Sequence, residues 1–240
     1  MNISVGSVDI WTLFVTIRDE ILIPASGSMF RIGNNVTNIT TFVSFCLCYD
    51  SFVDINDMFY CSYRDSHRII RKPLDNSLNS YSIIAGGGYY GSTADLLWNP
   101  YGIFVDINLD LYVADYSYSR IQRFHQGQLN ATTVAGGAVS ATTISLYYPA
   151  AVILDADKYL YIVDYWNHRI VGQGPNGFRC IVGCNGGGSA SDQLAYPMSL
   201  SFDSYGNLFV VDRDNNRIQK FVLASNSCSK SCKSRVTTIE

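Results

Sequence analysis

Apolar residues alternate with polar ones, or form short runs, along most of this chain, and turn residues separate the runs. These patterns are typical of β-strands, and no helical period interrupts them. The predicted strands are 102–106, 109–114, 119–124 and 132–135, then 151–154, 160–163, 169–171 and 179–182, then 200–202, 208–211 and 217–222. The fold class is therefore predicted to be all-β, made of four-stranded antiparallel sheets.

The strand pattern repeats in tandem. Three segments that begin at Leu96, Leu146 and Leu194 align almost without gaps, and their prolines recur at intervals of 49 and 48 residues. The same two intervals separate the repeated acidic and basic positions, which are Asp115, Asp164 and Asp212, and Arg120, Arg169 and Arg217. A period near 50 without helical pattern indicates one β-rich unit copied in sequence.

An earlier copy is more divergent. Residues 51–71 align with the copy from Leu96 if Asp54 matches Asp106 and Arg68 matches Arg120, and Tyr63 then replaces the second-strand aspartate. The fourth strand of this copy is predicted at 82–85. Residues 7–13 resemble only the third strand of a still earlier unit. Residues 14–41 fit no copy, so we expect an insertion or a loop between units there.

The repeated residues carry a family resemblance. Pro-x-Gly or a variant, an apolar-Val-Asp strand end, Leu-Tyr-Val-x-Asp and, after four intervening residues, Arg-Ile-Gln-x-Phe together resemble the NHL repeat of six-bladed β-propellers. The match covers residues 46–224 and is most specific from Leu96 to Phe221. Ala150-Ala151 and Gly172-Gln173 depart from the pattern. The resemblance implies about four recognisable blades plus a partial one, with an incomplete six-bladed ring as one alternative.

This interpretation divides the chain into two parts. Residues 1–45 are expected to form a partial or diverged blade with an insertion, and residues 46–240 the repeat propeller. The expected blades are about 46–95, 96–145, 146–193 and 194–240. The N-terminal segment has an apolar run without preceding positive residues, so it is a poor signal peptide, and we expect the chain to begin partway through a longer polypeptide.

Repetition argues against catalysis, because a reactive group needs a unique environment. We interpret Asp115, Asp164 and Asp212 as structural: each carboxylate ends a second strand, accepts turn N–H groups and faces the arginine five residues later. The aspartates that end the first strands are interpreted in the same way. The glycine runs that follow the fourth strands are explained by tight turns between blades, since no phosphate-loop pattern accompanies them.

Charge and histidine content bear on the alternatives. The chain has 17 Lys and Arg against 20 Asp and Glu, so a basic face for RNA, which some NHL propellers use, is not expected. With 3 histidines and no ligand motif, neither a metal centre nor another cofactor is predicted. A metal-dependent propeller enzyme of the lyase or lactone-hydrolase type stays open as an alternative, as does an RNA-binding NHL propeller.

The cysteines indicate the compartment. Cys180 and Cys184 bracket a fourth strand, and Cys228 and Cys232 follow the last repeat; local disulfides explain both pairs better than zinc does. With 7 cysteines, one is left for a partner outside this segment. Glycosylation triplets begin at Asn2, Asn35, Asn38 and Asn130. We therefore expect an extracellular or cell-surface location, without a membrane span in this segment, and an intracellular location stays open.

The leading hypothesis for function is a non-catalytic binding module for a protein or a glycan. Recognition residues gather in loops on a rigid scaffold, and the turns between second and third strands vary between copies. The candidate contacts are Tyr116, Tyr118, Tyr165, Trp166 and Arg213. The competing interpretation is that these aromatic residues only cover neighbouring blades.

Overall fold

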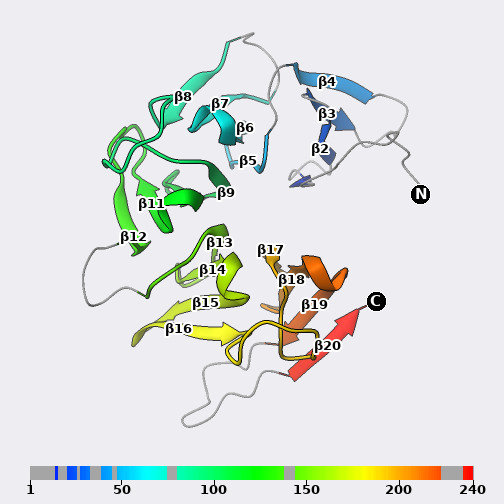
Figure 1. Ribbon diagram of the computed structural model, residues 1–240. Helices are drawn as coiled ribbons and strands as arrows, with labels where there is room; N and C mark the ends of the chain where they lie inside the picture. Colours follow the sequence, from blue (N-terminus) through cyan, green and yellow to red (C-terminus); the bar gives the residue numbers. More distant parts are fainter. Residues whose placement is uncertain are drawn as a thin grey trace. The chain divides into compact units, whose positions relative to one another are not determined.

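The computed structural model describes residues 48–74, 80–137 and 144–222 with their side chains, and five further strands as backbone only. In this part of the chain the strands form five four-stranded sheets, each made of four consecutive strands (Figure 1). The only helical elements among the described residues are short 3₁₀ turns, so none of them could span a membrane.

The sheets are named here in chain order. The first contains β1 Phe14–Val15, β2 Ile21–Ala25, β3 Ser28–Ile32 and β4 Ile39–Ser44, and the second contains β5 Ser51–Val53, β6 Met58–Tyr63, β7 Arg68–Pro73 and β8 Ser82–Ala85. The third contains β9 Pro100–Val105, β10 Leu111–Asp115, β11 Arg120–Phe124 and β12 Thr132–Gly136. The fourth contains β13 Pro149–Leu154, β14 Leu160–Asp164, β15 Arg169–Gly174 and β16 Gly177–Val182. The fifth contains β17 Pro197–Phe202, β18 Leu208–Asp212, β19 Arg217–Val222 and β20 Arg235–Ile239.

The strands predicted from the repeats are confirmed, with ends shifted by a few residues. The chain divides into two compact units, one of residues 1–111 and 124–130 and the other of residues 112–123 and 131–240. The first unit contains the first two sheets and β9. The second unit contains the fourth and fifth sheets and most of the remaining strands of the third.

The first hairpin of each repeat is closed by its aspartate. The carboxylate of Asp106 accepts hydrogen bonds from the backbone N–H groups of Asn108 and Asp110, at 2.8 and 3.0 Å. The backbone N–H of Asp106 in turn donates to the Asp110 carbonyl. Equivalent bonds form at the aligned aspartates, which are Asp54, Asp155 and Asp203. These carboxylates therefore fix a turn, as the repeat pattern predicts.

The second turn of each repeat is one turn of 3₁₀ helix. These turns are η1 Arg64–Ser66, η2 Tyr116–Tyr118, η3 Tyr165–Asn167 and η4 Arg213–Asn215. Each ends in a residue with left-handed backbone, at φ between 50 and 54°; the four residues are His67, Ser119, His168 and Asn216. A left-handed residue ends a short helical turn and reverses the chain, so that the third strand can pair with the second.

A hydrogen bond joins this second turn to the start of the next sheet. His67 Nδ1 accepts from the backbone N–H of Asn99 at 3.2 Å, and His168 Nδ1 accepts from that of Tyr196 at 3.0 Å. Ser119 Oγ does the same for Tyr148 at 3.2 Å. We call this contact the turn-to-strand bond. It explains why residues with an acceptor side chain occupy the left-handed position.

Glycine at the end of the fourth strand lets the chain pass close to the same turn. Gly136 and Gly183 have positive φ, and a Cβ at Gly183 would overlap with the carbonyl oxygen of His168. The same restriction applies at Gly86, against the carbonyl of His67. Only glycine combines this backbone conformation with such an approach. The glycine runs therefore serve backbone geometry, as predicted.

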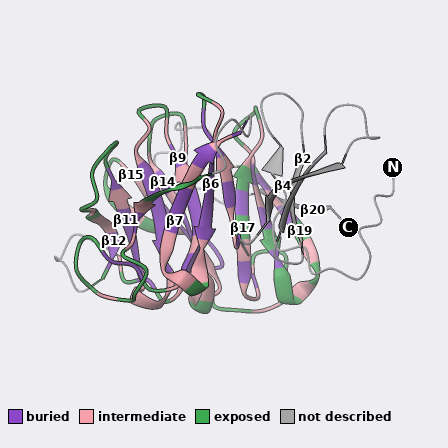
Figure 2. Ribbon diagram, turned by 90° about the horizontal axis from the view of Figure 1, so that it is seen from above, coloured by how far each residue is buried: buried purple, intermediate pink, exposed green. Residues whose placement is uncertain are grey.

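Apolar side chains fill the space between sheets. In the second unit, Val163 and Ile170 of the fourth sheet share a core with Leu208, Val210 and Phe221 of the fifth. In the first unit, the core of the second sheet contains Phe59 and Ile70 beside a disulfide. Buried residues are concentrated in strands such as β6, β7 and β14, whereas exposed residues lie mainly in the connections (Figure 2).

One face of the fifth sheet carries apolar residues that stay exposed. Val211 and Ile218 are 39% and 50% exposed, and with Phe209 they line a cavity of about 610 Å³. Val163 and Ile170, which lie 48 positions earlier in the repeat, are fully buried. The difference arises because Val163 and Ile170 face the fifth sheet. We call the Phe209, Val211 and Ile218 surface the open face.

The first sheet corrects the expectation for residues 14–41. Four strands occupy residues 14–44, where we expected an insertion or a loop. Its β3–β4 pairing contains a bulge: Met29 pairs with Val43 and Phe30 pairs with Thr41, so one residue of β4 is skipped. The β7–β8 pairing of the second sheet has the same irregularity, since one residue of β8 is skipped between the partners of Ile69 and Ile70. Only two residues separate β2 from β3, so this sheet has no room for the four-residue turn that carries the repeat motif. The expected strand in residues 7–13 lies outside the described residues.

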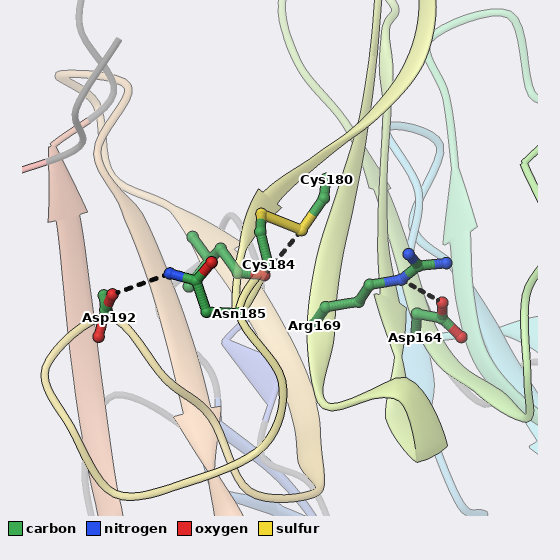
Figure 3. The surroundings of a disulfide bond; sticks show 7 residues. Asp164, Arg169, Cys180, Cys184, Asn185 and Asp192 are labelled. Atoms are coloured by element: carbon green, nitrogen blue, oxygen red, sulfur yellow. Dashed lines mark hydrogen bonds and ion pairs between the residues drawn. A yellow bond between two sulfur atoms is a disulfide. The ribbon is translucent and has the colours of Figure 1, made fainter. Parts of the chain in front are cut away.

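Two disulfides lie in the described residues. Cys180 and Cys184 are bonded as predicted, at the end of β16 and close to the Asp164–Arg169 ion pair (Figure 3). Cys48 and Cys61 form a second bond, which joins the segment before β5 to β6. Sequence analysis placed these two cysteines in the diverged copy without pairing them. The predicted pair Cys228 and Cys232 lies outside the described residues.

Candidate binding surface

The repeated ion pairs stand at the base of the turns that hold the candidate contacts. The carboxylates of Asp115, Asp164 and Asp212 are completely buried. Each accepts a hydrogen bond from the Nε of the arginine five residues later, and the distances for Arg120, Arg169 and Arg217 are 2.6, 2.8 and 2.7 Å. These charge-assisted bonds connect the end of the second strand to the beginning of the third.

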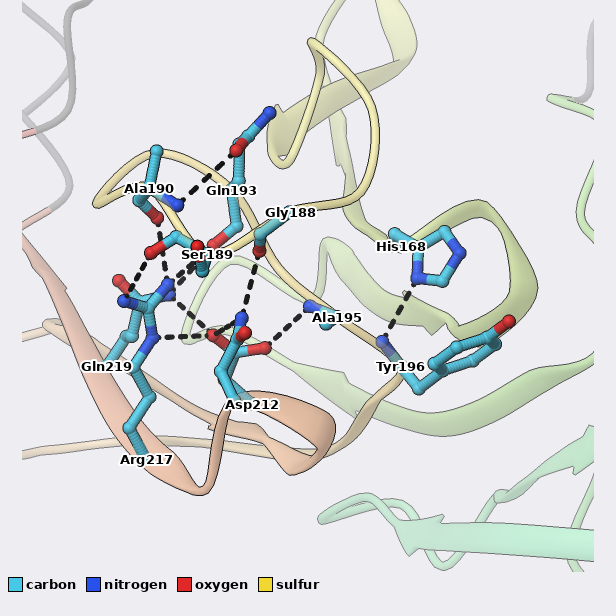
Figure 4. Close-up of polar contacts among 11 residues, drawn as sticks. His168, Gly188, Ser189, Ala190, Gln193, Ala195, Tyr196, Asp212, Arg217 and Gln219 are labelled. Carbon is cyan, nitrogen blue, oxygen red and sulfur yellow. Dashed lines mark hydrogen bonds and ion pairs between the residues drawn. The ribbon is translucent and has the colours of Figure 1, made fainter.

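The rest of each carboxylate is also occupied. In the fifth sheet, Asp212 Oδ1 accepts from the backbone N–H of Ala195 at 2.6 Å, and its Oδ2 accepts from Asn215 and Gln219 (Figure 4). In the fourth sheet, Asp164 Oδ1 accepts from the backbone N–H of Tyr147 at 2.7 Å. Both oxygens of Asp164 and of Asp212 therefore have hydrogen-bond partners within the fold.

The arginine of each pair also binds the connection between sheets. The guanidinium of Arg217 donates to the backbone carbonyls of Ser189, Ala190 and Gln193 (Figure 4). Arg169 donates to the carbonyl of Ser145 at 2.9 Å. One ion pair thus holds both a turn within its sheet and the irregular segment that precedes that sheet.

The diverged copy keeps this position with different chemistry. Tyr63 replaces the aspartate, and the Arg68 guanidinium lies over its ring at 5.7 Å. A cation–π contact therefore occupies the place of the ion pair.

The three histidines form contacts within the fold. His67 and His168 form the turn-to-strand bonds described above, and His125 contacts Asp110 at 2.9 Å. Among the described residues, no three His, Cys, Asp or Glu side chains gather closely enough to hold a metal ion.

Two groups in the first unit have strongly raised pKa values. Burial raises the pKa of Asp50 to about 7, although hydrogen bonds from the backbone N–H groups of Ile103 and Ser51 act in the opposite direction. Burial, together with the hydrogen bond to Asp54, raises the pKa of Tyr60 to about 12. Both shifts follow from desolvation, so neither marks a reactive group by itself.

A cavity of about 250 Å³ lies in the first unit beside Tyr60. Its walls are mostly apolar and include Leu111 and Phe124, with Arg71 and His125 as the basic groups. Tyr60 donates its hydroxyl to Asp54 and His125 pairs with Asp110, so much of the polar capacity of this cavity is already used.

A group of aromatic side chains lies in the second unit. Six aromatic rings there form a continuous group that we call the aromatic cluster; its members are Tyr116, Tyr147, Tyr148, Tyr165, Trp166 and Tyr196. They come from η2, from η3 and from the residues just before β13 and β17. In an antiparallel sheet these connections lie at the same end of the strands, which brings the rings together.

The rings contact one another directly. The centroid distance is 4.8 Å between Tyr116 and Tyr148, and 4.7 Å between Tyr147 and Tyr148. Trp166 lies 5.9 Å from Tyr147 and 5.5 Å from Tyr196. These separations are within the range of favourable aromatic pairs. The cluster is therefore a packed surface in which each ring supports its neighbours.

The structure brings four of the five candidate residues to one place. Tyr116, Tyr165 and Trp166 belong to the aromatic cluster, and Arg213 Nη1 donates to the Tyr165 hydroxyl at 2.8 Å. The ring of Tyr118 lies under the guanidinium of Arg120 at 5.1 Å.

Sequence analysis missed three members of the cluster. Tyr147, Tyr148 and Tyr196 precede the repeated prolines Pro149 and Pro197. The signal was present in the segments LYYP and LAYP, which place tyrosines directly before the first strand. Antiparallel topology places both connections at one end of the sheet.

Part of the cluster is open to solvent. Trp166 is 44% exposed and Tyr147 is 50% exposed, whereas Tyr116, Tyr148 and Tyr165 are half-buried. Within the part of the chain that the structure describes, the hydroxyl groups of Tyr147, Tyr148 and Tyr196 and the indole N–H of Trp166 form no hydrogen bond. The surface therefore offers apolar ring area together with unused polar groups.

Comparison with known proteins supports the fold. No protein-family model and no curated protein match the sequence. A streptogramin B lyase structure matches with a TM-score of 0.62 at 12% identity, over 100% of this chain and 71% of that chain. A nidogen/laminin complex structure matches at 0.65 and 18%, over 88% and 74%. An auxiliary nutrient binding protein from Bacteroides ovatus matches at 0.68 and 12%, over 96% and 57%.

These three matches are β-propeller proteins, and each blade of a propeller is a four-stranded antiparallel sheet. The predicted all-β propeller fold is therefore confirmed. Identities of 12 to 18% establish the fold alone, so the activities named for these proteins are not transferred to this chain.

Proposed function

We propose that this chain is an NHL-type propeller that acts as a non-catalytic binding module, and that its ligand is a protein or a glycan. The NHL assignment is supported by the order of the repeated Pro, Asp and Arg residues. The binding role is supported chiefly by one observation: six packed aromatic rings from several connections present exposed surface at Trp166 and Tyr147.

The repeated polar groups support a non-catalytic role. Asp115, Asp164 and Asp212 are buried and bonded to arginines, so they serve the scaffold. A scaffold with fixed turns loses little conformational entropy when its surface residues contact a ligand. Rigid aromatic side chains likewise give a large contact area at low entropic cost.

We also propose an extracellular location. Two disulfides in the described residues are typical of an oxidising compartment. Asn130, which begins a glycosylation triplet, is exposed in the connection before β12. One structural match is a nidogen/laminin complex, which is a protein–protein assembly. It is in keeping with a binding role for this fold.

The proposal is tested by an unbiased ligand search followed by a scan. The labelled 240-residue chain is applied to a protein array and a glycan array, and every ligand found is measured against five single variants. The variants are Tyr116→Ala, Tyr118→Ala, Tyr165→Ala, Trp166→Ala and Arg213→Ala. We expect Trp166→Ala and Tyr165→Ala to weaken binding at least about tenfold, since buried aromatic contacts dominate binding energy.

Tyr205→Ala serves as the control. Tyr205 is 89% exposed in the first turn of the fifth sheet. This variant should bind like the unmodified chain. A set of ligands whose affinities are the same in all of the variants would show that the aromatic cluster is not the binding surface.

A further inference from the structure

The form of the aromatic cluster restricts the ligands that it can accept. Neighbouring rings lie 4.7 to 6.4 Å apart between centroids, which is direct contact. A ligand ring has no slot between them and must stack on the exposed surface of Trp166 and Tyr147. The cluster therefore acts as a platform rather than as a groove.

The polar groups at the platform add a second restriction. The hydroxyls of Tyr147, Tyr148 and Tyr196 are unused within the described residues, and each can donate and accept a hydrogen bond. The indole N–H of Trp166 adds a donor. A matching ligand has an apolar face bordered by groups that both accept and donate.

The charges at the border of the cluster balance one another, which favours a neutral ligand. Asp164 and Asp212 are completely buried and paired with arginines. Arg213, whose side chain is 51% exposed, donates to Tyr165 and lies 3.8 Å from the carboxylate of Asp214, which is 46% exposed. A charged ligand would therefore meet an ion pair of both signs rather than a single unpaired counter-charge.

We propose that the aromatic cluster binds a neutral pyranose oligosaccharide, an inference that rests on the proposed binding function. One face of a pyranose ring is lined by C–H groups that stack on an aromatic ring, and its hydroxyls donate and accept at the border. A proline-rich peptide fits less well, because its prolines insert between aromatic rings and its backbone offers acceptors without donors at those residues.

Binding is measured by saturation-transfer NMR and calorimetry on the full chain. The probes are the hexasaccharides of β-1,4-linked glucose, N-acetylglucosamine and mannose and of α-1,4-linked glucose, with a ten-residue polyproline peptide for comparison. We expect at least one hexasaccharide to bind with a Kd of about 1 mM or tighter. Trp166→Ala should weaken it at least about tenfold, and Trp166→Phe, which keeps a stacking ring, should weaken it less.

Tyr205→Ala is the matched control, because it removes an exposed tyrosine from a different turn of the same unit. Absence of binding to all four hexasaccharides, or binding that is unchanged in Trp166→Ala and Tyr147→Ala, would overturn the glycan assignment. Polyproline binding that depends on Trp166 would overturn it too, yet would leave the binding function intact. The binding function itself fails only if array ligands of every class ignore the cluster.

Discussion

At the scale of single residues, this fold depends on a few positions where the backbone conformation and the space available accept only glycine. Gly86, Gly136 and Gly183 each combine positive φ with an approach to a carbonyl oxygen that a Cβ would block. The residues that face them are themselves left-handed, as His67 and His168 show. Two unusual backbone conformations therefore meet at one point in each repeat.

Replacing one of these glycines should destabilise the fold. We expect Gly183→Ala to lower the free energy of unfolding by about 2 kcal/mol or more, because alanine disfavours positive φ and its Cβ meets the His168 carbonyl. Gly174→Ala is the control, since nothing lies within 4 Å of its Cβ position and its φ is not positive. Urea denaturation of both variants decides the matter, and equal losses would contradict this account.

Asp50 should give the protein a stability that depends on pH. Its pKa rises on folding from 3.8 to about 7, so the folded state binds this proton more tightly than the unfolded state. The contribution of this group to stability is then largest below pH 4 and falls as the pH rises toward 7. The loss is as much as about 4 kcal/mol, since one pKa unit corresponds to about 1.4 kcal/mol.

Asp50→Asn removes this titration. Denaturation curves between pH 4 and 8 should show the unfolding free energy of the unmodified chain falling relative to that of the variant as pH rises. A constant difference between the two chains across this range would show that Asp50 does not keep its proton on folding.

At the scale of elements, the third and fourth sheets each carry the same three connections. Aspartate closes the first turn, the Asp–Arg pair closes the second, and the turn-to-strand bond reaches the next sheet. One disulfide adds a covalent connection to the second sheet and the other adds one to the fourth sheet, and the two bonds have different surroundings. Cys48 and Cys61 are buried in the core of the second sheet, whereas Cys184 is exposed in the connection after β16.

These surroundings predict the order of reduction. Under mild dithiothreitol, Cys180–Cys184 should open first, because a thiolate reaches the exposed sulfur of Cys184, while Cys48–Cys61 should open only on unfolding. Iodoacetamide labelling followed by peptide mass spectrometry distinguishes the pairs. If Cys61 were labelled as early as Cys184, the second-sheet core would have to open locally in the native state.

The sequence predicted the strands and ion pairs more completely than it predicted the aromatic cluster. The copies from Leu96 onward share period, turn residues and charges, so strands and ion pairs could be assigned from local pattern. The strands of the first sheet were not assigned individually within the expected diverged blade, because the two-residue connection between β2 and β3 leaves no place for the Asp and Arg signature. Tyr147 and Tyr196 were missed because their proximity to η3 depends on how strands pair, which no local window contains.

At the scale of the whole molecule, equivalent residues have unequal surroundings. Ile121 and Ile170 are completely buried in the third and fourth sheets, while Ile218 at the same repeat position is half exposed on the open face. Repetition of sequence therefore does not imply repetition of environment. The fifth sheet exposes an apolar position that is buried in the third and fourth sheets.

This inequality gives a direct comparison. Ile170→Lys places a charge in the core and should cost at least about 3 kcal/mol of unfolding free energy, whereas Ile218→Lys should cost less than about 1 kcal/mol. Guanidinium denaturation of the two variants provides the measurement, with Ile121→Lys as a second buried reference. A large loss in Ile218→Lys would reveal that the open face is covered in solution.

The turn-to-strand bond also bears on how such a chain can change in length. Its acceptor lies in one repeat and its donor at the start of the following one, so the joint is encoded on both sides of the three boundaries that separate the second to fifth sheets. A duplicated repeat would therefore carry the donor of this hydrogen bond at its beginning and the acceptor at its second turn. Lengthening the protein by whole modules would then require no new interface to evolve.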